Sequence, residues 1–314
     1  MGKLVMDRSE ATLVDSSVQD EMARANRALR SLAPVIAHLL DSDGMNLVND
    51  AIVARLRGML SHIASQLLSS QGEAGVQADD KTSAHSVLVG QLGADERVTR
   101  HLYAVALELH LTDGLEQRGA NDPVLTPLMQ ELIASDRPAT AETAMAAMAA
   151  QSRFVQLGRR MELPIGELPF EVFTSVIDHL ETVDLGFDQR AVADALSGLR
   201  GDFDEGTGRL GLLARLVSGM QGGAIAALDI GHAGLALFAS AAASQSRQTR
   251  DDIIFACHES QAMRLALSLK AAGLEKTEIE KQFSLLGGSA FLPQTFGTLL
   301  QADALNLLHE SGGV

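Results

Sequence analysis

Apolar residues recur at helical spacing along much of the chain, most clearly between residues 46 and 68. There they follow one another at steps of three or four: Val48, Ile52, Leu56, Met59, Ile63 and Leu67. This spacing places all of them on one face of an α-helix. A shorter apolar series between Leu29 and Leu39 predicts a helix upstream. The two helices predict a helical hairpin or small bundle within residues 1–70.

Residues 71–82 interrupt this pattern with glycine, charge and few apolar side chains. Such a composition is typical of a linker or mobile loop, so we expect a boundary there. Helical spacing returns beyond it, throughout residues 83–314, most clearly at residues 98–109, 170–180, 192–199 and 213–220. Residues 249–252 and 277–280 each resemble a capping box, which predicts a helix start at both places. The pattern therefore predicts a second region that is also made of helices.

Two stretches of this second region share an outline. Residues 159–173 and residues 269–283 each run from a basic helix end, through a short break, into an amphipathic segment that reaches a phenylalanine. Helix pairs that expose one apolar face must stack to bury it, which is the basis of solenoid arrays. We therefore expect an all-α fold, with the hairpin region followed by HEAT-like stacked helix pairs in a solenoid-like arrangement.

Residues 149–156, residues 161–164 and residues 264–274 also carry a resemblance to a known family. Together they resemble an uncharacterised bacterial helical-repeat family, catalogued as a domain of unknown function with serial number 2336. The resemblance covers about the second half of the chain. It implies a HEAT-like helical fold and supplies no catalytic residues.

Composition supports helices and bears on the kind of partner. Hydrophobic residues make up 46% of the chain, aromatic residues only 4%, and tryptophan is absent, which disfavours a β-sandwich or barrel. The net charge of −15 opposes binding to a phosphate backbone. The densest basic group, Arg153, Arg159 and Arg160, is typical of a helix C-terminus that complements the helix dipole. We expect a protein partner and no nucleic acid.

The single cysteine, Cys257, excludes an internal disulfide and any site with several thiolates, and it fits a reducing compartment. Charged residues at the N-terminus replace the apolar stretch of a secretory signal. No uninterrupted apolar run reaches the ~18 residues of a membrane span. We therefore expect a cytoplasmic protein without membrane insertion.

Two motifs suggest a cofactor or a metal but lack the required context. Residues 206–211 spell the dinucleotide fingerprint, yet the acidic residues before them are not the buried strand that this motif requires. The acidic run that starts at Asp202 places Thr207 and Leu213 where a calcium loop requires glycine and glutamate. We predict a helix junction here, with no cofactor and no metal.

Cys257 and His258 suggest a nucleophile and its base. Sequence neighbours on a helix point to different sides, so we expect Cys257 to be a buried structural thiol instead. His258 with Glu259 resembles the phosphoacceptor box of histidine kinases, although the proline of that box is absent. A surface histidine is the simpler interpretation, and a phosphoacceptor is the alternative.

Met145 and Met148 lie at helical spacing among alanines, which is typical of core filling. The alternative is a contact surface for a partner. Because no catalytic constellation is visible, we predict a non-enzymatic protein-interaction or regulatory module. The alternatives are a phosphorelay component that uses His258 and an enzyme whose site is assembled from distant helices.

Overall fold

A computed structural model describes residues 8–30, 50–70, 78–183, 188–288 and 292–311. All regular structure in these ranges is helical, and they contain no strand. The α-helices are α1 (Arg8–Arg30), α3 (Asp50–Ser69), α4 (Ala78–Ala94), α5 (Glu96–Gln117), α6 (Pro127–Ile133), α7 (Pro138–Arg159), α8 (Phe170–Thr182), α9 (Gln189–Asp202), α10 (Arg209–Met220), α11 (Ile230–Ser246), α12 (Arg250–Ala256), α13 (Ala262–Ala271), α14 (Lys276–Leu285) and α15 (Gln301–Ser311). Short 3-10 helices lie between them, at η1 (Ile165–Glu167), η2 (Glu205–Thr207), η3 (Gln221–Leu228), η4 (Glu259–Gln261) and η5 (Gln294–Thr298).

Local sequence signals explain where several helices begin and end. The Asp95 carboxylate accepts backbone N–H groups in the first turn of α5, and Thr249 does so at the start of α12. Such caps satisfy amide groups that have no partner within the helix. After α13 the chain turns at Gly273, whose φ of 103° suits a residue without a side chain.

The helices pack in pairs around one continuous core that extends from Val18 to Leu308. α3 pairs with α4 and α5, α7 with α10, and α13 with α15. The central helix is α5, which also contacts α8, α11 and α12. These contacts confirm the prediction of an all-α, solenoid-like fold built of packed helix pairs. Several pairs join helices that are distant in the sequence, so the stacking does not simply follow chain order.

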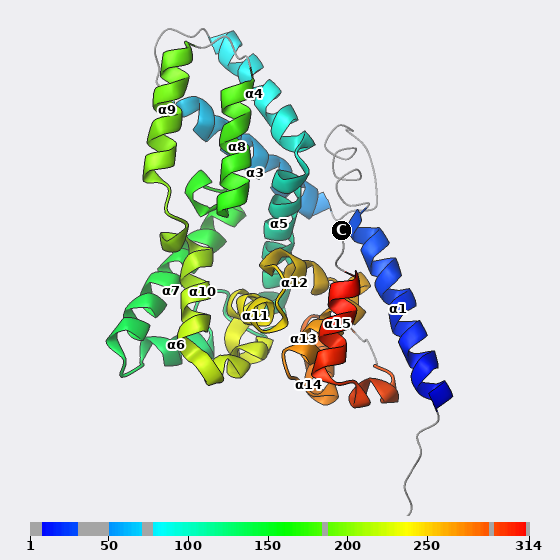
Figure 1. Cartoon of the computed structure of the whole chain (residues 1–314). Helices are drawn as coiled ribbons and strands as arrows, with labels where there is room; N and C mark the ends of the chain where they lie inside the picture. Colours follow the sequence, from blue (N-terminus) through cyan, green and yellow to red (C-terminus); the bar gives the residue numbers. More distant parts are fainter. Residues whose placement is uncertain (1–7, 31–49, 71–77, 184–187, 289–291, 312–314) are drawn as a thin grey trace, which may run out of the picture.

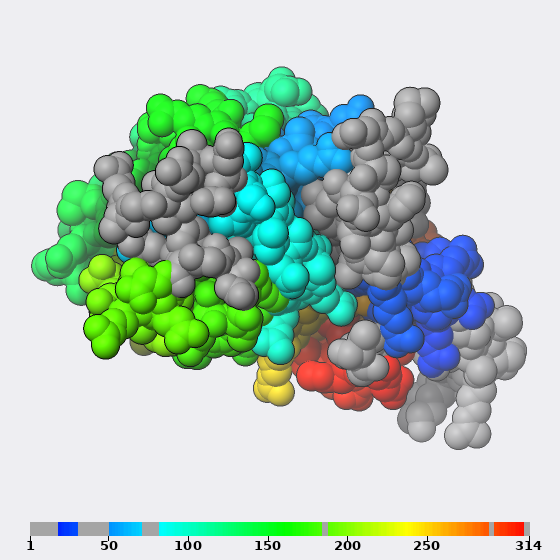
Figure 2. Space-filling model, turned by 90° about the horizontal axis from the view of Figure 1, so that it is seen from above, coloured from blue at the N-terminus to red at the C-terminus, as the bar shows by residue number. Residues whose placement is uncertain are grey.

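Helices α7 and α1 lie at opposite ends of the molecule (Figure 1). The view from above agrees, with α4 in cyan between the green helices of one side and the blue α1 of the other (Figure 2). α6, α7 and α10 lie together at the left edge of Figure 1, while α13, α14 and α15 lie on the side of α1. α7 is therefore a peripheral helix with one side toward the rest of the protein.

The predicted boundaries agree only in part with these helices. α3 matches the helix predicted over residues 46–68, and it packs directly against α4 and α5. Residues 78–82, predicted as part of a loop, belong to α4 instead. Aspartates are favoured in the first turn of a helix, where Asp79 and Asp80 stand. Most of the helix predicted between Leu29 and Leu39 lies outside the described residues.

Among the described residues, one segment, Arg209–Leu228, is long and apolar enough by length and composition to cross a membrane. It comprises α10 and η3, which are divided at Gln221, where φ is 48°. The side chain of Arg209, at its start, is ion-paired inside the protein. In this fold the segment is therefore two short helices attached to the core.

Candidate functional site

A cluster of three charged side chains, two buried and one partly buried, joins three helices. Glu108 of α5 meets Arg209, the first residue of α10, and Arg250, the first residue of α12. Arg209 donates to the two carboxylate oxygens at 2.8 and 3.0 Å, and Arg250 donates to them at 2.7 and 2.6 Å. Both arginines thus bind one carboxylate through two hydrogen bonds each, which is the strongest arrangement for this pair of groups.

The Glu108 side chain is only 1% exposed, so its charge state depends on these neighbours. Burial alone would raise the pKa of Glu108, but the charges and hydrogen bonds of Arg209 and Arg250 hold that pKa well below its usual range. The carboxylate is therefore ionised at neutral pH. Because both of its oxygens are bound to arginine and closed off from solvent, its role in this structure is to join helices.

The same cluster fixes the inner side of α7. The Arg209 guanidinium lies 3.6 Å from the centre of the Phe154 ring and donates to the side-chain oxygen of Gln151 at 3.2 Å. Gln151 in turn donates to the carbonyl of Pro123 at 3.0 Å. Near the end of α7, a Cβ placed on Gly158 would lie 2.5 Å from a methyl group of Leu109. α7 is therefore held rigidly against α5 and α10.

The opposite side of α7 is free of such contacts in the described part of the chain. Met145, one of the two predicted contact residues, is 50% exposed. Met148 is half-buried and packs against the core, while Ala144, Ala147 and Ala150 are buried. The two methionines therefore have different surroundings: Met145 points outward, and Met148 belongs partly to the core.

Arginines follow along the exposed side of α7 toward its C-terminus. Arg153, Arg159 and Arg160 are all exposed. The Arg159 guanidinium lies 3.7 Å from the Glu116 carboxylate, a loose surface pair. We define Met145, Ala149, Arg153 and Gln156 of α7, together with Arg160 directly after its last residue, as the outer face of α7; all five are exposed.

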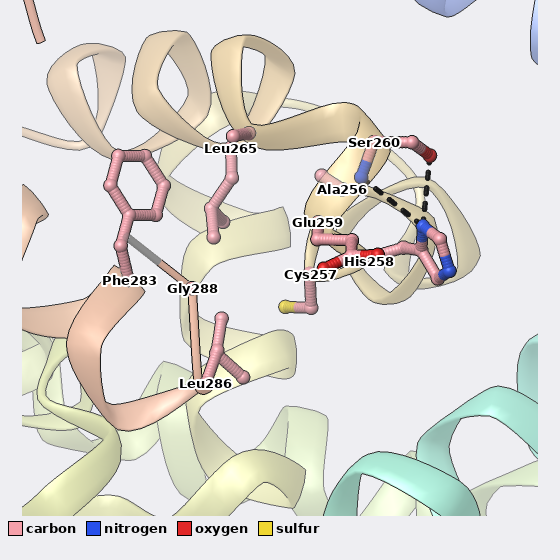
Figure 3. A pocket seen from close by; sticks show the side chains of 10 residues that line it. Ala256, Cys257, His258, Glu259, Ser260, Leu265, Phe283, Leu286 and Gly288 are labelled. Carbon is pink, nitrogen blue, oxygen red and sulfur yellow. Dashed lines mark hydrogen bonds between the residues drawn. The ribbon is translucent and has the colours of Figure 1, made fainter. Parts of the chain in front are cut away.

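A second candidate site is a cavity of about 440 Å³ beside Cys257 and His258. Leu265, Phe283 and Leu286 form its apolar part, and Figure 3 shows how these side chains surround it. The Cys257 sulfur points toward Leu286, whereas the His258 ring points the other way (Figure 3). The two side chains therefore do not face each other as a nucleophile and base must.

The chemistry of Cys257 also argues against a nucleophile. Burial raises the pKa of its thiol to about 12, and the carboxylate of Glu108 acts in the same direction, while Arg250 opposes them. The thiol is therefore protonated at neutral pH, and only a thiolate attacks efficiently. This supports the prediction of a buried structural cysteine.

His258 lies at the junction of α12 and η4 and not on the exposed face of a long helix. It is half-buried, and its Nδ1 accepts the Ser260 backbone N–H at 3.2 Å and lies 2.8 Å from the Ser260 hydroxyl oxygen. This nitrogen caps the short helix. A phosphoacceptor role for His258 stays a prediction.

Other histidines stabilise contacts between helices. His101 lies 2.9 Å from Asp251, and His179 lies 2.9 Å from Asp95. Within the described residues, no group of three or more His, Cys, Asp or Glu side chains could hold a metal ion.

The glycine-rich stretch at residues 206–211 lies where η2 meets α10. A Cβ on Gly211 would lie 2.4 Å from the carbonyl oxygen of Glu205, so this glycine permits a close approach of backbone segments. Arg209, in the middle of the stretch, points into the buried cluster. The sequence therefore forms a tight helix junction, in agreement with its interpretation above.

The buried cluster was missed by the sequence analysis, although two signals were present. Glu108 stands within an apolar helical series, between Val105 and Leu109, where a charge requires a partner. Arg209 and Arg250 open their helices, where a positive charge opposes the helix dipole. Neither signal identifies which residues meet.

In comparisons with known proteins, no family model, curated protein or solved structure matches this chain. The resemblance to the helical-repeat family therefore stays a prediction.

Proposed function

We propose that this chain is a non-enzymatic protein-interaction module of the cytoplasm that holds a protein partner on the outer face of α7. The observation that carries the proposal is the exposure of Met145 on a helix whose other side is fixed by the buried charge cluster. A rigid helix loses little conformational freedom on binding, so more of the contact energy appears as affinity.

The energy available from Met145 is moderate. Full burial of a methionine side chain contributes about 1.5–3 kcal/mol, and half of this side chain is still exposed. A partner that covers it therefore gains about 1 kcal/mol from this contact. Methionine also adapts its shape to different apolar groups, which suits a contact residue.

The net charge of −15 supports a protein partner over a nucleic acid. The state of Cys257 supports a non-enzymatic function, because its thiol is buried, protonated and turned away from His258. A ligand for the cavity beside these residues is not needed for the proposal.

The test is a pull-down from the native cell with the tagged full chain and two charge variants. Met145→Glu places a charge on the outer face of α7, while Leu300→Glu places one on a side chain that is 66% exposed, just before α15. We expect Met145→Glu to lose a partner that Leu300→Glu retains. Equal recovery by the wild type and both variants would remove this face from consideration.

A further inference from the structure

We infer that the partner segment on the outer face of α7 is an acidic amphipathic helix. This inference rests on the function proposed above and specifies the chemistry of the partner. The outer face has an apolar end, at Met145 and Ala149, and a basic end, at Arg153 and Arg160. An occupant that matches both ends carries apolar and acidic side chains on one side.

The residues of the outer face form one continuous stripe. They follow one another at steps of four, four, three and four, which keeps them on one side of the helix. At 1.5 Å per residue, the stripe from Met145 to Arg160 is about 22 Å long. This length corresponds to four turns of a second helix lying along α7.

Small side chains favour a helix as the occupant. Ala146 and Ala149 are exposed beside Met145, so the backbone of a partner could approach α7 closely. Helices pack at axial distances of about 8–10 Å where the side chains in contact are small enough. The Met145 side chain then fills the groove between turns of the partner, as knobs of this kind do in packed helix pairs.

Charge favours an acidic partner. The stripe itself carries two arginines and no acidic residue, while Glu142 precedes Met145, Glu116 pairs loosely with Arg159 and Glu162 follows Arg160. Acidic groups of a partner are therefore attracted to the C-terminal half of α7. The net charge of −15 repels any strongly anionic partner at long range, so a short acidic segment is attracted only where it lies directly against these arginines, within the screening length.

The probe is a synthetic helical peptide with a leucine stripe flanked by glutamates, compared with a peptide of the same pattern that carries lysines. Fluorescence anisotropy measures the binding of each peptide to the full chain at low and at physiological salt. We expect the glutamate peptide to bind more tightly than the lysine peptide, and to weaken as salt screens its charges.

Single substitutions on α7 and on α9 test whether the peptide binds to α7. Arg153→Glu replaces an attraction by a repulsion, so we expect the affinity for the glutamate peptide to fall about 5- to 10-fold. Arg190→Glu makes the same change on the exposed start of α9 and is expected to change the affinity by less than about 2-fold. Met145→Glu removes the apolar contact and also repels the glutamates of the peptide, so the two effects together should weaken binding about 10-fold.

Several results would overturn the inference. These are equal or tighter binding of the lysine peptide, equal effects of Arg153→Glu and Arg190→Glu, and an oligonucleotide that binds more tightly than the glutamate peptide and depends on Arg153. If Met145→Glu abolishes the pull-down while no variant changes peptide binding, the proposed function stands and the acidic helix is wrong. If Met145→Glu changes neither assay, both are wrong.

Discussion

Replacing Glu108 by glutamine tests whether the buried charge cluster stabilises the fold. Glutamine has nearly the same shape as glutamate, so the packing around residue 108 changes little. The negative charge disappears, however, and the guanidinium groups of Arg209 and Arg250 are left close together with no carboxylate between them. Arg209 is only 4% exposed and Arg250 15%, so water cannot replace the lost partner without rearrangement.

The expected cost follows from known buried ion pairs. Removing one partner of such a pair typically destabilises a protein by about 3–5 kcal/mol, because the remaining charge is buried without compensation. The glutamine side chain would retain one acceptor oxygen, and Arg250 is partly exposed to solvent, so the cost lies at the lower end of this range. We therefore expect Glu108→Gln to lower the free energy of unfolding by about 3 kcal/mol.

Urea unfolding followed by circular dichroism measures this free energy. With a slope of about 3 kcal/mol per molar urea, the midpoint should fall by about 1 M. The matched control is Glu131→Gln, because Glu131 is exposed and forms only a surface pair with His232; it should cost less than about 0.5 kcal/mol. A loss below about 1 kcal/mol in Glu108→Gln would refute our account of the cluster.

The acid dependence of stability provides a second readout for the same residue. The pKa of Glu108 is lowered in the folded state, so the folded chain releases this proton more easily than the unfolded chain does. Its stabilisation is therefore complete above the ordinary glutamate pKa of about 4.3 and declines as the pH falls below it. Glu108→Gln should lack this part of the decline, since glutamine does not titrate.

Three further predictions concern single positions. Gly211→Ala should destabilise the fold by about 1–3 kcal/mol in urea unfolding, because its Cβ would meet the Glu205 carbonyl oxygen. Its control, Gly198→Ala, has open space on α9 and should stabilise the fold by about 0.5–1 kcal/mol; the opposite order would contradict the tight junction. Cys257 should react with iodoacetamide at pH 8 far more slowly in the native chain than in urea, as mass spectrometry can follow, and equal rates would show that the thiol is accessible. Asp95→Ala should lower the free energy of unfolding by about 1–2 kcal/mol, as measured by thermal unfolding, because α5 loses its cap and Ser175 of α8 loses its hydrogen-bond acceptor. An unchanged melting temperature would mean that neither contact stabilises the fold.

The sequence predicts the helical class and several helix limits because these depend on local chemistry. The apolar series at residues 46–68 becomes α3, and Thr249 caps α12 by accepting the backbone N–H of Asp252, as the pattern at residues 249–252 predicts. The second predicted box, at Thr277, is wrong: Glu275 and Glu278 form it, two residues earlier. Glutamate is uncommon at the cap position and threonine is favoured there, so the sequence pattern points to Thr277.

The tertiary partners of each helix could not be predicted. Glu108 binds residues that are 101 and 142 positions away, and hydrophobic periodicity carries no information on such pairings. For the same reason the sequence does not predict which of the two methionines, Met145 or Met148, is exposed. Both lie on one apolar series, and which of them is covered depends on how α7 packs against its neighbours α6 and α10.

The buried cluster holds α7 in place, and the outer face of α7 depends on this for binding a partner. A helix at the edge of a domain has few contacts, and it would lose binding energy if a partner had to order it first. Here three of the buried residues on the inner side are alanines, Ala144, Ala147 and Ala150, which bury little area each. The directed contacts of Gln151 and Phe154 with Arg209 supply the positional restraint that small apolar side chains cannot, because hydrogen bonds and ring stacking depend on orientation. A partner on Met145 therefore meets a surface that is already in place.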